Sequence, residues 1–278
     1  MRKLIVVASV AAGLLTGCDQ KSTGKRETLS EALVAKSLSN MVPVKGGEFL
    51  MGDFGPLVGQ KLPFSINQDD KVLHKVVLSD FSISKFKVTN DDYNKYLQIT
   101  GVKKSPIHIF LKNYPSLQKG DYSVGVTWQQ AKDYCQWLGK GSGKKIDLPT
   151  EAQWEYAAAG GESYPYAGSD NIRDVAYYAS NANERLHPVG EKRENGFDLY
   201  DMSGNAAEWC TDWMSRYENT RVTDPQGPAE NPGHHKKIVR GGSYLANERD
   251  MDIRHRSVQT YDTSEPHIGF RVVLNPIQ

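Results

Sequence analysis

The chain has little cysteine, no hydrophobic run of membrane length and no excess of either charge. Only three of its 278 residues are cysteines, and none follows Cys210. The main apolar stretch lies within the first 15 residues and is shorter than the run of about 20 that crosses a bilayer. Lys and Arg total 34 and Asp and Glu total 33, which removes the electrostatic argument for nucleic acid or an acidic membrane surface. We therefore expect a soluble body after the leader and no nucleic-acid partner.

Residues 1–17 resemble the signal peptide of a bacterial lipoprotein. Two basic residues precede an apolar core at 4–15. Leu-Thr-Gly-Cys at 15–18 has the small residue before the cut and the thiol after it that a lipobox needs. We predict cleavage before Cys18, a lipid on that cysteine and a periplasmic location. The alternative is an ordinary signal peptide with a chance cysteine, or a buried N-terminal helix.

Residues 18–40 are predicted to connect the lipid to a folded domain at 41–278. The polar, charged stretch at 19–28 is typical of a flexible tether. Apolar residues within 29–38 fall near one helical face, so a short helix is expected there. Asp19, directly after the lipidated cysteine, resembles the inner-membrane retention signal of enteric bacteria. We therefore predict that the anchor lies in the inner membrane.

Once Cys18 is acylated, only Cys135 and Cys210 are left to form a disulfide. An oxidising compartment allows that bridge. Two isolated cysteines can equally be buried as small hydrophobic side chains. Both possibilities stay open, because the sequence does not give the distance between the two residues.

Capping signals and alternating apolar residues predict a few regular elements. Three threonines, each followed three residues later by Asp or Gln, predict helices at 90–97, 128–138 and 151–159, closed by Gly101, Gly139 and Gly160. Short strands are expected at 42–44, 48–51, 75–78, 81–83, 238–240 and 269–274. The long stretches between them are rich in Gly, Asn, Asp and Pro, so much of the body should be irregular.

Seven motif blocks occur in an order that identifies a family. The most specific are LPTEAQWEYAA at 148–158, LYDMSGN at 199–205 and RGGSY at 240–244, and further blocks lie at 41–52, 74–96, 126–138 and 269–271. The ordered set resembles the formylglycine-generating enzyme family, also called the sulfatase-modifying factor domain. The resemblance covers nearly all of 41–274. It implies one α+β domain, a variant of the C-type-lectin-like fold with much irregular structure.

The resemblance does not extend to the catalytic residues of the family. Family enzymes use two cysteines just after the RGGSY block to hold copper and to exchange with the substrate cysteine. Here those places fall on Ala246 and Met251, and neither offers the thiolate that suits Cu(I). The family's cysteine near the final strand is also absent, since Val272 follows Arg271, which removes the natural disulfide partner of Cys135. We expect a pseudoenzyme with no copper cofactor.

The family fold also binds calcium. The resemblance places one site at the side chains of Asp201 and Glu208 and the carbonyls of Gly204 and Ala206. Carboxylate and carbonyl oxygens on a tight turn are the ligands that a structural Ca²⁺ requires. The alternative is that Asp201 caps a turn and Glu208 pairs with an arginine such as Arg240.

The missing thiols favour protein binding over catalysis. Residues 245–263 replace the cysteine-bearing segment with charged and hydrogen-bonding side chains. We predict Arg249, Arg254 and Tyr261 as contacts to a protein partner, because Arg and Tyr often anchor interfaces. The alternative is a solvated rim whose arginines pair internally with neighbouring aspartates.

Three functions are compatible with these features. The first is a lipid-anchored binding protein, one form of which is an immunity protein that neutralises a toxic effector of a secretion system. The second is a cysteine-independent periplasmic maturation enzyme of the same superfamily. The third is a structural lipoprotein of an envelope complex. Binding ranks first because the absent thiols are the most specific observation.

Overall fold

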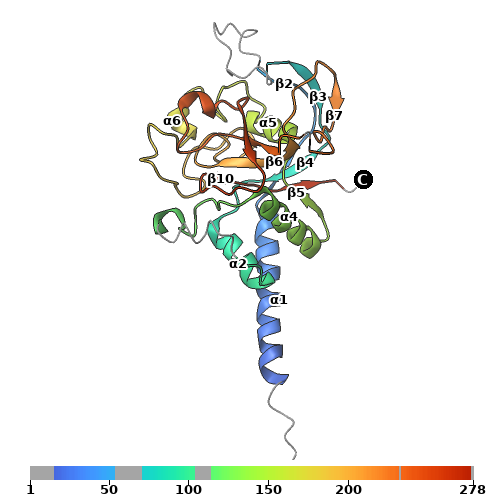
Figure 1. The fold of residues 1–278 in the computed structure, drawn as a ribbon, viewed down its shortest axis with the longest axis vertical. Helices are drawn as coiled ribbons and strands as arrows, with labels where there is room; N and C mark the ends of the chain where they lie inside the picture. The colour runs from blue at the N-terminus through green and yellow to red at the C-terminus, as the bar shows by residue number, and fades with distance from the viewer. Residues whose placement is uncertain (1–15, 54–70, 104–113, 232, 277–278) are drawn as a thin grey trace, which may run out of the picture.

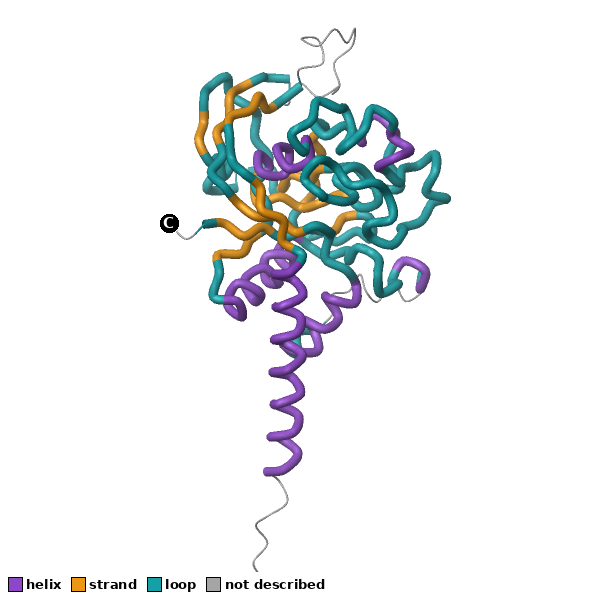
Figure 2. The backbone as a smooth tube through the Cα atoms, turned by 180° about the vertical axis from the view of Figure 1, so that it is seen from behind, coloured by secondary structure: helices purple, strands orange, loops and turns teal. Residues whose placement is uncertain are grey.

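The computed structural model describes residues 16–53, 71–103, 114–231 and 233–276. Helices α1 (Thr16–Ser39), α2 (Asn90–Thr100) and α4 (Trp128–Ser142) gather at one end of the body. Small sheets, long loops and shorter helices make up the rest (Figures 1 and 2). The α+β class and the large share of irregular chain are therefore confirmed. The predicted signal peptide lies almost wholly outside the described residues.

Helix α1 projects from the body and points away from the sheets (Figure 1). Its last turns are packed: Leu33 and Val34 are buried in the core, and Lys36 Nζ lies 2.6 Å from the carboxylate of Asp92 on α2. The flexible tether predicted at 19–28 is wrong, because those residues continue the helix. Several of them are good helix formers, and the packed end provides a nucleus from which the helix extends. No helix in the described part of the chain is long and apolar enough to cross a bilayer.

Local capping fixes the ends of the other helices. The side chain of Thr150 accepts a hydrogen bond from the amide of Gln153 and completes the capping box that begins α5 (Glu151–Ala159). Helix α4 begins with the same motif, also as predicted. It continues one turn past its predicted end, because the left-handed cap is Gly143, with φ +66°, and not Gly139.

The strands of the described residues form three small sheets. The first has the order β1-β4-β11-β5, the second β10-β6-β8-β9 and the third β2-β3-β7. Their bounds are β1 Met41–Val44, β2 Glu48–Met51, β3 His74–Val77, β4 Phe81–Ser84, β5 Lys145–Asp147, β6 Ala207–Trp213, β7 Val222–Thr223, β8 Lys236–Arg240, β9 Arg256–Thr260, β10 Ile268–Gly269 and β11 Val273–Asn275.

The predicted strands are confirmed within one or two residues, except that the last one divides into β10 and β11. Strands β5, β6, β7 and β9 were not predicted. Strand β6 carries Glu208 and Asp212, both buried, so its sequence lacks the alternation of a half-buried strand. Strand β9 is polar and lies at the edge of its sheet, where burial constrains the sequence least.

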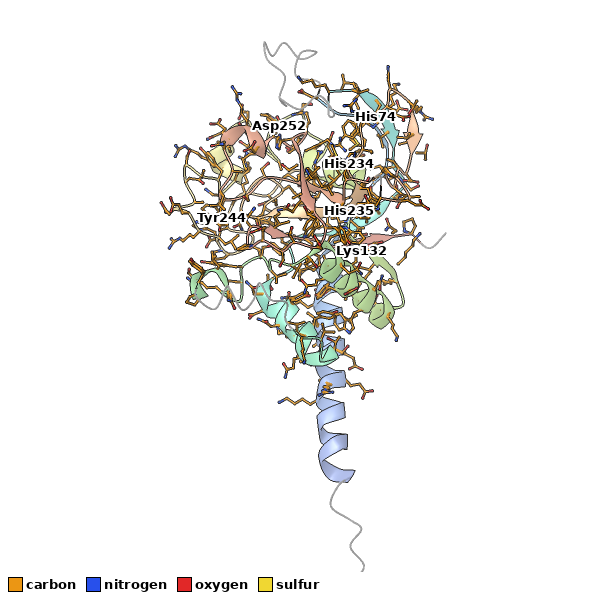
Figure 3. All side chains as sticks on the ribbon, in the orientation of Figure 1. His74, Lys132, His234, His235, Tyr244 and Asp252 are labelled. Carbon is orange, nitrogen blue, oxygen red and sulfur yellow. The ribbon has the colours of Figure 1, made fainter. Side chains whose placement is uncertain are left out.

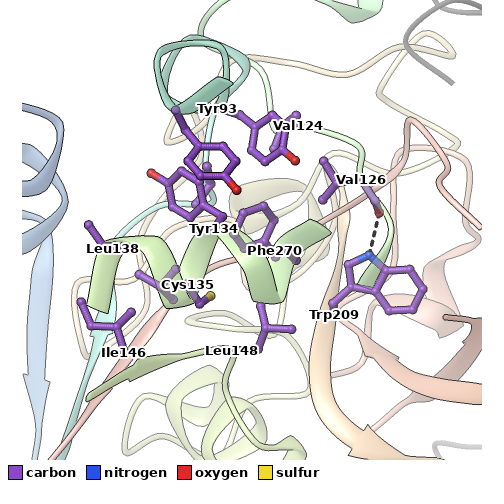
Figure 4. Close-up of a cluster of buried hydrophobic side chains, with 14 of the residues drawn as sticks. Tyr93, Val124, Val126, Tyr134, Cys135, Leu138, Ile146, Leu148, Trp209 and Phe270 are labelled. Atoms are coloured by element: carbon purple, nitrogen blue, oxygen red, sulfur yellow. Dashed lines mark hydrogen bonds between the residues drawn. The ribbon is translucent and has the colours of Figure 1, made fainter. Parts of the chain in front are cut away.

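An aromatic cluster joins α4 to the second sheet (Figure 4). The rings of Tyr134 and Phe270 meet edge to face with centroids 5.4 Å apart. Trp209 on β6 is fully buried and its Nε1 donates a 2.9 Å hydrogen bond to the carbonyl of Val126. Cys135 packs in the same cluster. The helices are therefore held against the sheet by apolar contacts and by the hydrogen bond of the Trp209 indole.

Paired charges form a second core beneath α5. Arg240 is fully buried and binds Glu151 (Nη1 to Oε1, 2.9 Å) and Glu155. Arg256 also binds Glu151 (Nε to Oε1, 2.6 Å). Burial raises the pKa of Glu155 despite Arg240. The pKa of Glu151 is lowered, because two arginines together outweigh its burial. The cluster therefore depends on Arg240 as the main cation of Glu155.

Candidate functional site

A pocket of about 300 Å³ lies beside β9 and the loop that follows β8. Asp252, within the segment that borders it, lies at the end of the body away from α1 (Figure 3). Strands β6 and β8 supply Ala207 and Val239 to the pocket wall. Its polar lining residues are Ser243, Asp250, His255, Ser257, Gln259 and His267. The pocket offers hydrogen-bonding groups and an apolar wall.

The positions predicted for the family's thiols lie together at this pocket. Ala246 lines it and also packs against the apolar cluster that contains Met251. Met251 is fully buried behind the pocket, against Gly242. Gly242 has φ +66°, and a Cβ there would lie 2.1 Å from the methyl group of Met251. The methyl group of Ala246 and the buried thioether of Met251 therefore occupy the two positions predicted for the thiols.

No other thiol compensates within the described residues. Cys135 and Cys210 are free and fully buried, in different core clusters. Burial raises the pKa of both thiols well above its usual value, so neither forms a thiolate at neutral pH. Of the two possibilities left open by the sequence, the structure has the small buried side chains and not the disulfide. The structure does not describe the side chain of Cys18.

The histidines of the pocket do not form a nucleophilic relay. His255 Nε2 lies 3.6 Å from Asp250 Oδ1 and 3.2 Å from Ser257 Oγ. A relay needs the carboxylate at one ring nitrogen and the hydroxyl at the other, whereas both groups face the same nitrogen here. Burial lowers the pKa of His267, with Glu265 opposing it, so that ring is neutral at neutral pH. The geometry suits hydrogen bonding to a ligand.

The three residues predicted to contact a protein partner differ in their exposure to solvent. Arg249 is exposed, and Tyr261 is half-buried with its ring against Trp213, at 5.6 Å between centroids. Arg254 is only 2% exposed and pairs with Asp252, Nη1 to Oδ1 at 3.2 Å. The prediction of Arg254 as a surface contact is therefore wrong, and the internal pairing given as the alternative holds for this residue.

Sequence reasoning missed two apolar residues at the pocket rim. Val258 lines the pocket and is 37% exposed, and Leu245, next to Ala246, is 51% exposed. Val258 lies in the strand that was not predicted, so nothing in the sequence indicated which way its side chain points. Exposed apolar side chains beside a polar pocket are a common feature of binding surfaces.

The turn predicted to bind calcium contains cations from the protein itself. Glu208 is fully buried and both its oxygens contact Arg271, at 2.7 and 2.9 Å. Lys87 Nζ lies 3.1 Å from Glu208 Oε1 and donates to the carbonyl of Asp201. No group of three His, Cys, Asp or Glu side chains is arranged to hold a metal in the described ranges. The residues therefore do not fit a calcium ion that uses Glu208 as a ligand.

Larger cavities lie elsewhere, among them two with volumes of about 370 and 530 Å³. The first lies where α1 meets α2, around the pair of Lys36 and Asp92. The second lies over Glu151 and Arg256, whose charges already pair with each other. Neither cavity is lined by the residues that directly follow the RGGSY motif, so the candidate site is not identified by cavity volume alone.

The family model described as "Sulfatase-modifying factor enzyme 1-like domain" matches residues 26–276. The formylglycine-generating enzyme of Streptomyces coelicolor is 29% identical, over 85% of this chain and 89% of that enzyme. Chaperone protein LppX of Paenibacillus barcinonensis is 27% identical, over 98% of this chain and 99% of that protein. Serine/threonine-protein kinase pkn1 of Chlamydia pneumoniae is 30% identical over 86% of this chain, which spans only 38% of the kinase.

Solved structures share the fold. PvdO from Pseudomonas aeruginosa aligns with a TM-score of 0.68 and 25% identity, over 85% of this chain and 94% of that one. Treponema denticola variable protein 1 aligns with a TM-score of 0.69 and 23% identity, over 85% and 95%. The mixed α+β, C-type-lectin-like architecture expected from the motif blocks is confirmed.

Proposed function

The chain belongs to the sulfatase-modifying factor enzyme 1-like family, and we propose that it acts by binding a protein and does not make formylglycine. The observation that carries the proposal is the pocket beside β9. Ala246 and Met251 stand where the family resemblance puts the copper-binding thiols, and the described cysteines are buried and un-ionised. What the pocket keeps is a set of hydrogen-bonding groups beside two exposed apolar side chains, Leu245 and Val258, which suits recognition of another chain.

The partner class that we propose first is a toxic effector, with this chain as the immunity protein that neutralises it. A second candidate is an unfolded client polypeptide. It is favoured by the similarity to a protein named as a chaperone, which spans nearly the full length of both chains. The two are separable by binding: an effector should form a stoichiometric complex as a folded protein, whereas a client should bind only when unfolded. The alternative of a cysteine-independent enzyme is weakened by the arrangement of His255, which provides no nucleophilic relay.

The full chain, incubated with copper and a sulfatase-type cysteine peptide, is expected to yield no formylglycine. The physical reason is that neither cysteine in the described body, Cys135 or Cys210, offers a thiolate to hold Cu(I) and exchange with the peptide. Peptide mass spectrometry measures the conversion, with the Streptomyces coelicolor enzyme as positive control and a protein-free sample as background. Conversion above that background would contradict the proposal.

We also propose that the protein is anchored in the periplasm through a lipid on Cys18. The similarity to LppX supports this proposal, because it covers nearly the whole of both chains and therefore includes the N-terminal region of this one. Cleavage before Cys18 would remove two of the 24 residues of helix α1, so the remaining 22 would extend about 33 Å and hold the body away from the membrane.

Replacing Cys18 by serine is expected to remove the anchor, because the hydroxyl is not acylated by the lipoprotein pathway. Fractionation should find the Cys18→Ser variant either soluble or unprocessed, and the parent in the membrane fraction. A processed Cys18→Ser variant that still sediments with membranes would show that the lipobox interpretation is wrong.

A further inference from the structure

Four buried charged groups meet where the family resemblance predicts calcium. Glu208 and Arg271 have fully buried side chains and form a two-point ion pair. The side chain of Lys87 is also fully buried and reaches Glu208 at 3.1 Å. Asp201 is 2% exposed, and its Oδ2 accepts a 2.8 Å hydrogen bond from the amide of Gly190. Two carboxylates and two cations therefore balance within one cluster.

The ammonium of Lys87 contacts one of the predicted calcium ligands, the Glu208 carboxylate, and the main chain of a second, Asp201. It donates to the main-chain carbonyl of Asp201 and pairs with the Glu208 carboxylate. Burial lowers the pKa of Lys87, while the charges of Glu208 and Asp201 oppose that shift. A protein ammonium has three donors and one charge, which matches a carbonyl and a shared carboxylate. Its position is therefore set by the oxygens of the turn.

A calcium ion would be a poor addition to this cluster. Calcium takes six to eight oxygen ligands at about 2.3–2.6 Å. Here both Glu208 oxygens already contact cationic nitrogens, and an additional dication would lie among two buried positive groups. Asp201 Oδ1 is buried without a hydrogen-bond partner, which is the one feature that a cation could still use. A single unpartnered oxygen does not make a calcium site.

We propose that the ammonium group of Lys87 is the permanent structural cation of this turn and takes the place that calcium has in the family. The turn leads directly into β6, whose first residue, Ala207, lines the pocket. The geometry of the pocket is then fixed without a metal. The protein keeps its fold and its binding surface when calcium is scarce.

Thermal unfolding of the full chain tests the proposal. The parent protein should melt at the same temperature with EDTA, with no addition and with millimolar CaCl₂. Lys87→Met should melt about 6–12 °C lower, because it leaves a buried carboxylate cluster short of one cation. The matched control is Lys85→Met, two residues away, whose ammonium lies over the ring of Tyr200 at 5.3 Å and should change the melting temperature little.

Two outcomes of these melting measurements would overturn the proposal, and a third follows from a double variant. One is a parent protein whose melting temperature falls on chelation, or that retains stoichiometric calcium after desalting, as measured by elemental analysis. The other is a Lys87→Met variant as stable as Lys85→Met. If Lys87→Met does not fold, the double variant Lys87→Met/Glu208→Gln keeps the charges balanced and should recover folding. Failure of that recovery, with Glu208→Gln alone folded, would also contradict the assigned role. None of these measurements depends on whether a protein partner exists.

Discussion

Replacing Arg240 by methionine is expected to lower the free energy of unfolding by about 3–5 kcal/mol. The guanidinium is fully buried and binds Glu151, Glu155 and the carbonyl of Ile253. Methionine fills much of the space but leaves Glu155 without its main cation, in a site whose burial already raises the pKa of that carboxyl. Glu151 should be less affected, because it keeps Arg256. Urea unfolding of the full chain measures the loss.

An exposed ion pair provides the control for this prediction. Lys45 and Asp80 lie 3.0 Å apart with side chains that are 87% and 61% exposed. Lys45→Met should change the free energy of unfolding by no more than about 1 kcal/mol. The double variant Arg240→Met/Glu155→Gln should recover part of the stability, because it removes the uncompensated charge. An Arg240→Met variant as stable as Lys45→Met would show that the buried pair is not needed.

Changes at the pocket rim, and at the two predicted partner contacts that are not fully buried, are expected to produce the largest losses of partner affinity. Arg249→Ala and Tyr261→Ala should each weaken binding by about 30-fold, equivalent to about 2 kcal/mol, if they anchor the interface. Val258→Glu should be at least as damaging, because a carboxylate would be desolvated against the partner. Titration of the identified partner, by calorimetry or surface plasmon resonance, gives each dissociation constant.

Leu50 offers a matched control for the rim. It is an exposed apolar residue, 47% accessible, but lies on β2 in a different sheet. Leu50→Glu should bind the partner as the parent does. Melting curves of all variants separate lost contacts from lost fold, a necessary check for Tyr261 because its ring packs on Trp213. Rim variants that bind as tightly as Leu50→Glu would place the interface on another face.

Local signals in the sequence predicted the elements that depend on local interactions. The capping box of Thr150 and Gln153 involves residues three apart, so it could be recognised without the fold. The length of α1 could not, because the sequence of its polar half has no apolar periodicity to indicate a helix, and the helix is stabilised from its packed end. Strand β6 was not predicted because a glutamate in its sequence argues against burial. Glu208 is nevertheless buried, since its charge is paired with those of Lys87 and Arg271, which are distant in the sequence.

The same distinction applies to the site. The ordered motif blocks located the segment after RGGSY, and the structure places Ala246 at a pocket there. The exposure of single residues in that segment was not predictable. Arg254 and Arg249 are chemically equivalent in the sequence, yet one pairs with Asp252 in the interior and the other lies at the surface. Which side of a loop is buried depends on the body against which it packs.

Site-specific photo-cross-linking in the cell of origin tests the central claim most directly. A photoreactive amino acid at position 258, in the otherwise unchanged full chain, is expected to give one predominant covalent adduct with a protein. The same group at position 50 should give none, and adding Leu245→Glu should abolish the adduct at 258 while the chain stays folded. An adduct at position 50 and none at 258, or no adduct at either position, would contradict binding of a protein through this pocket.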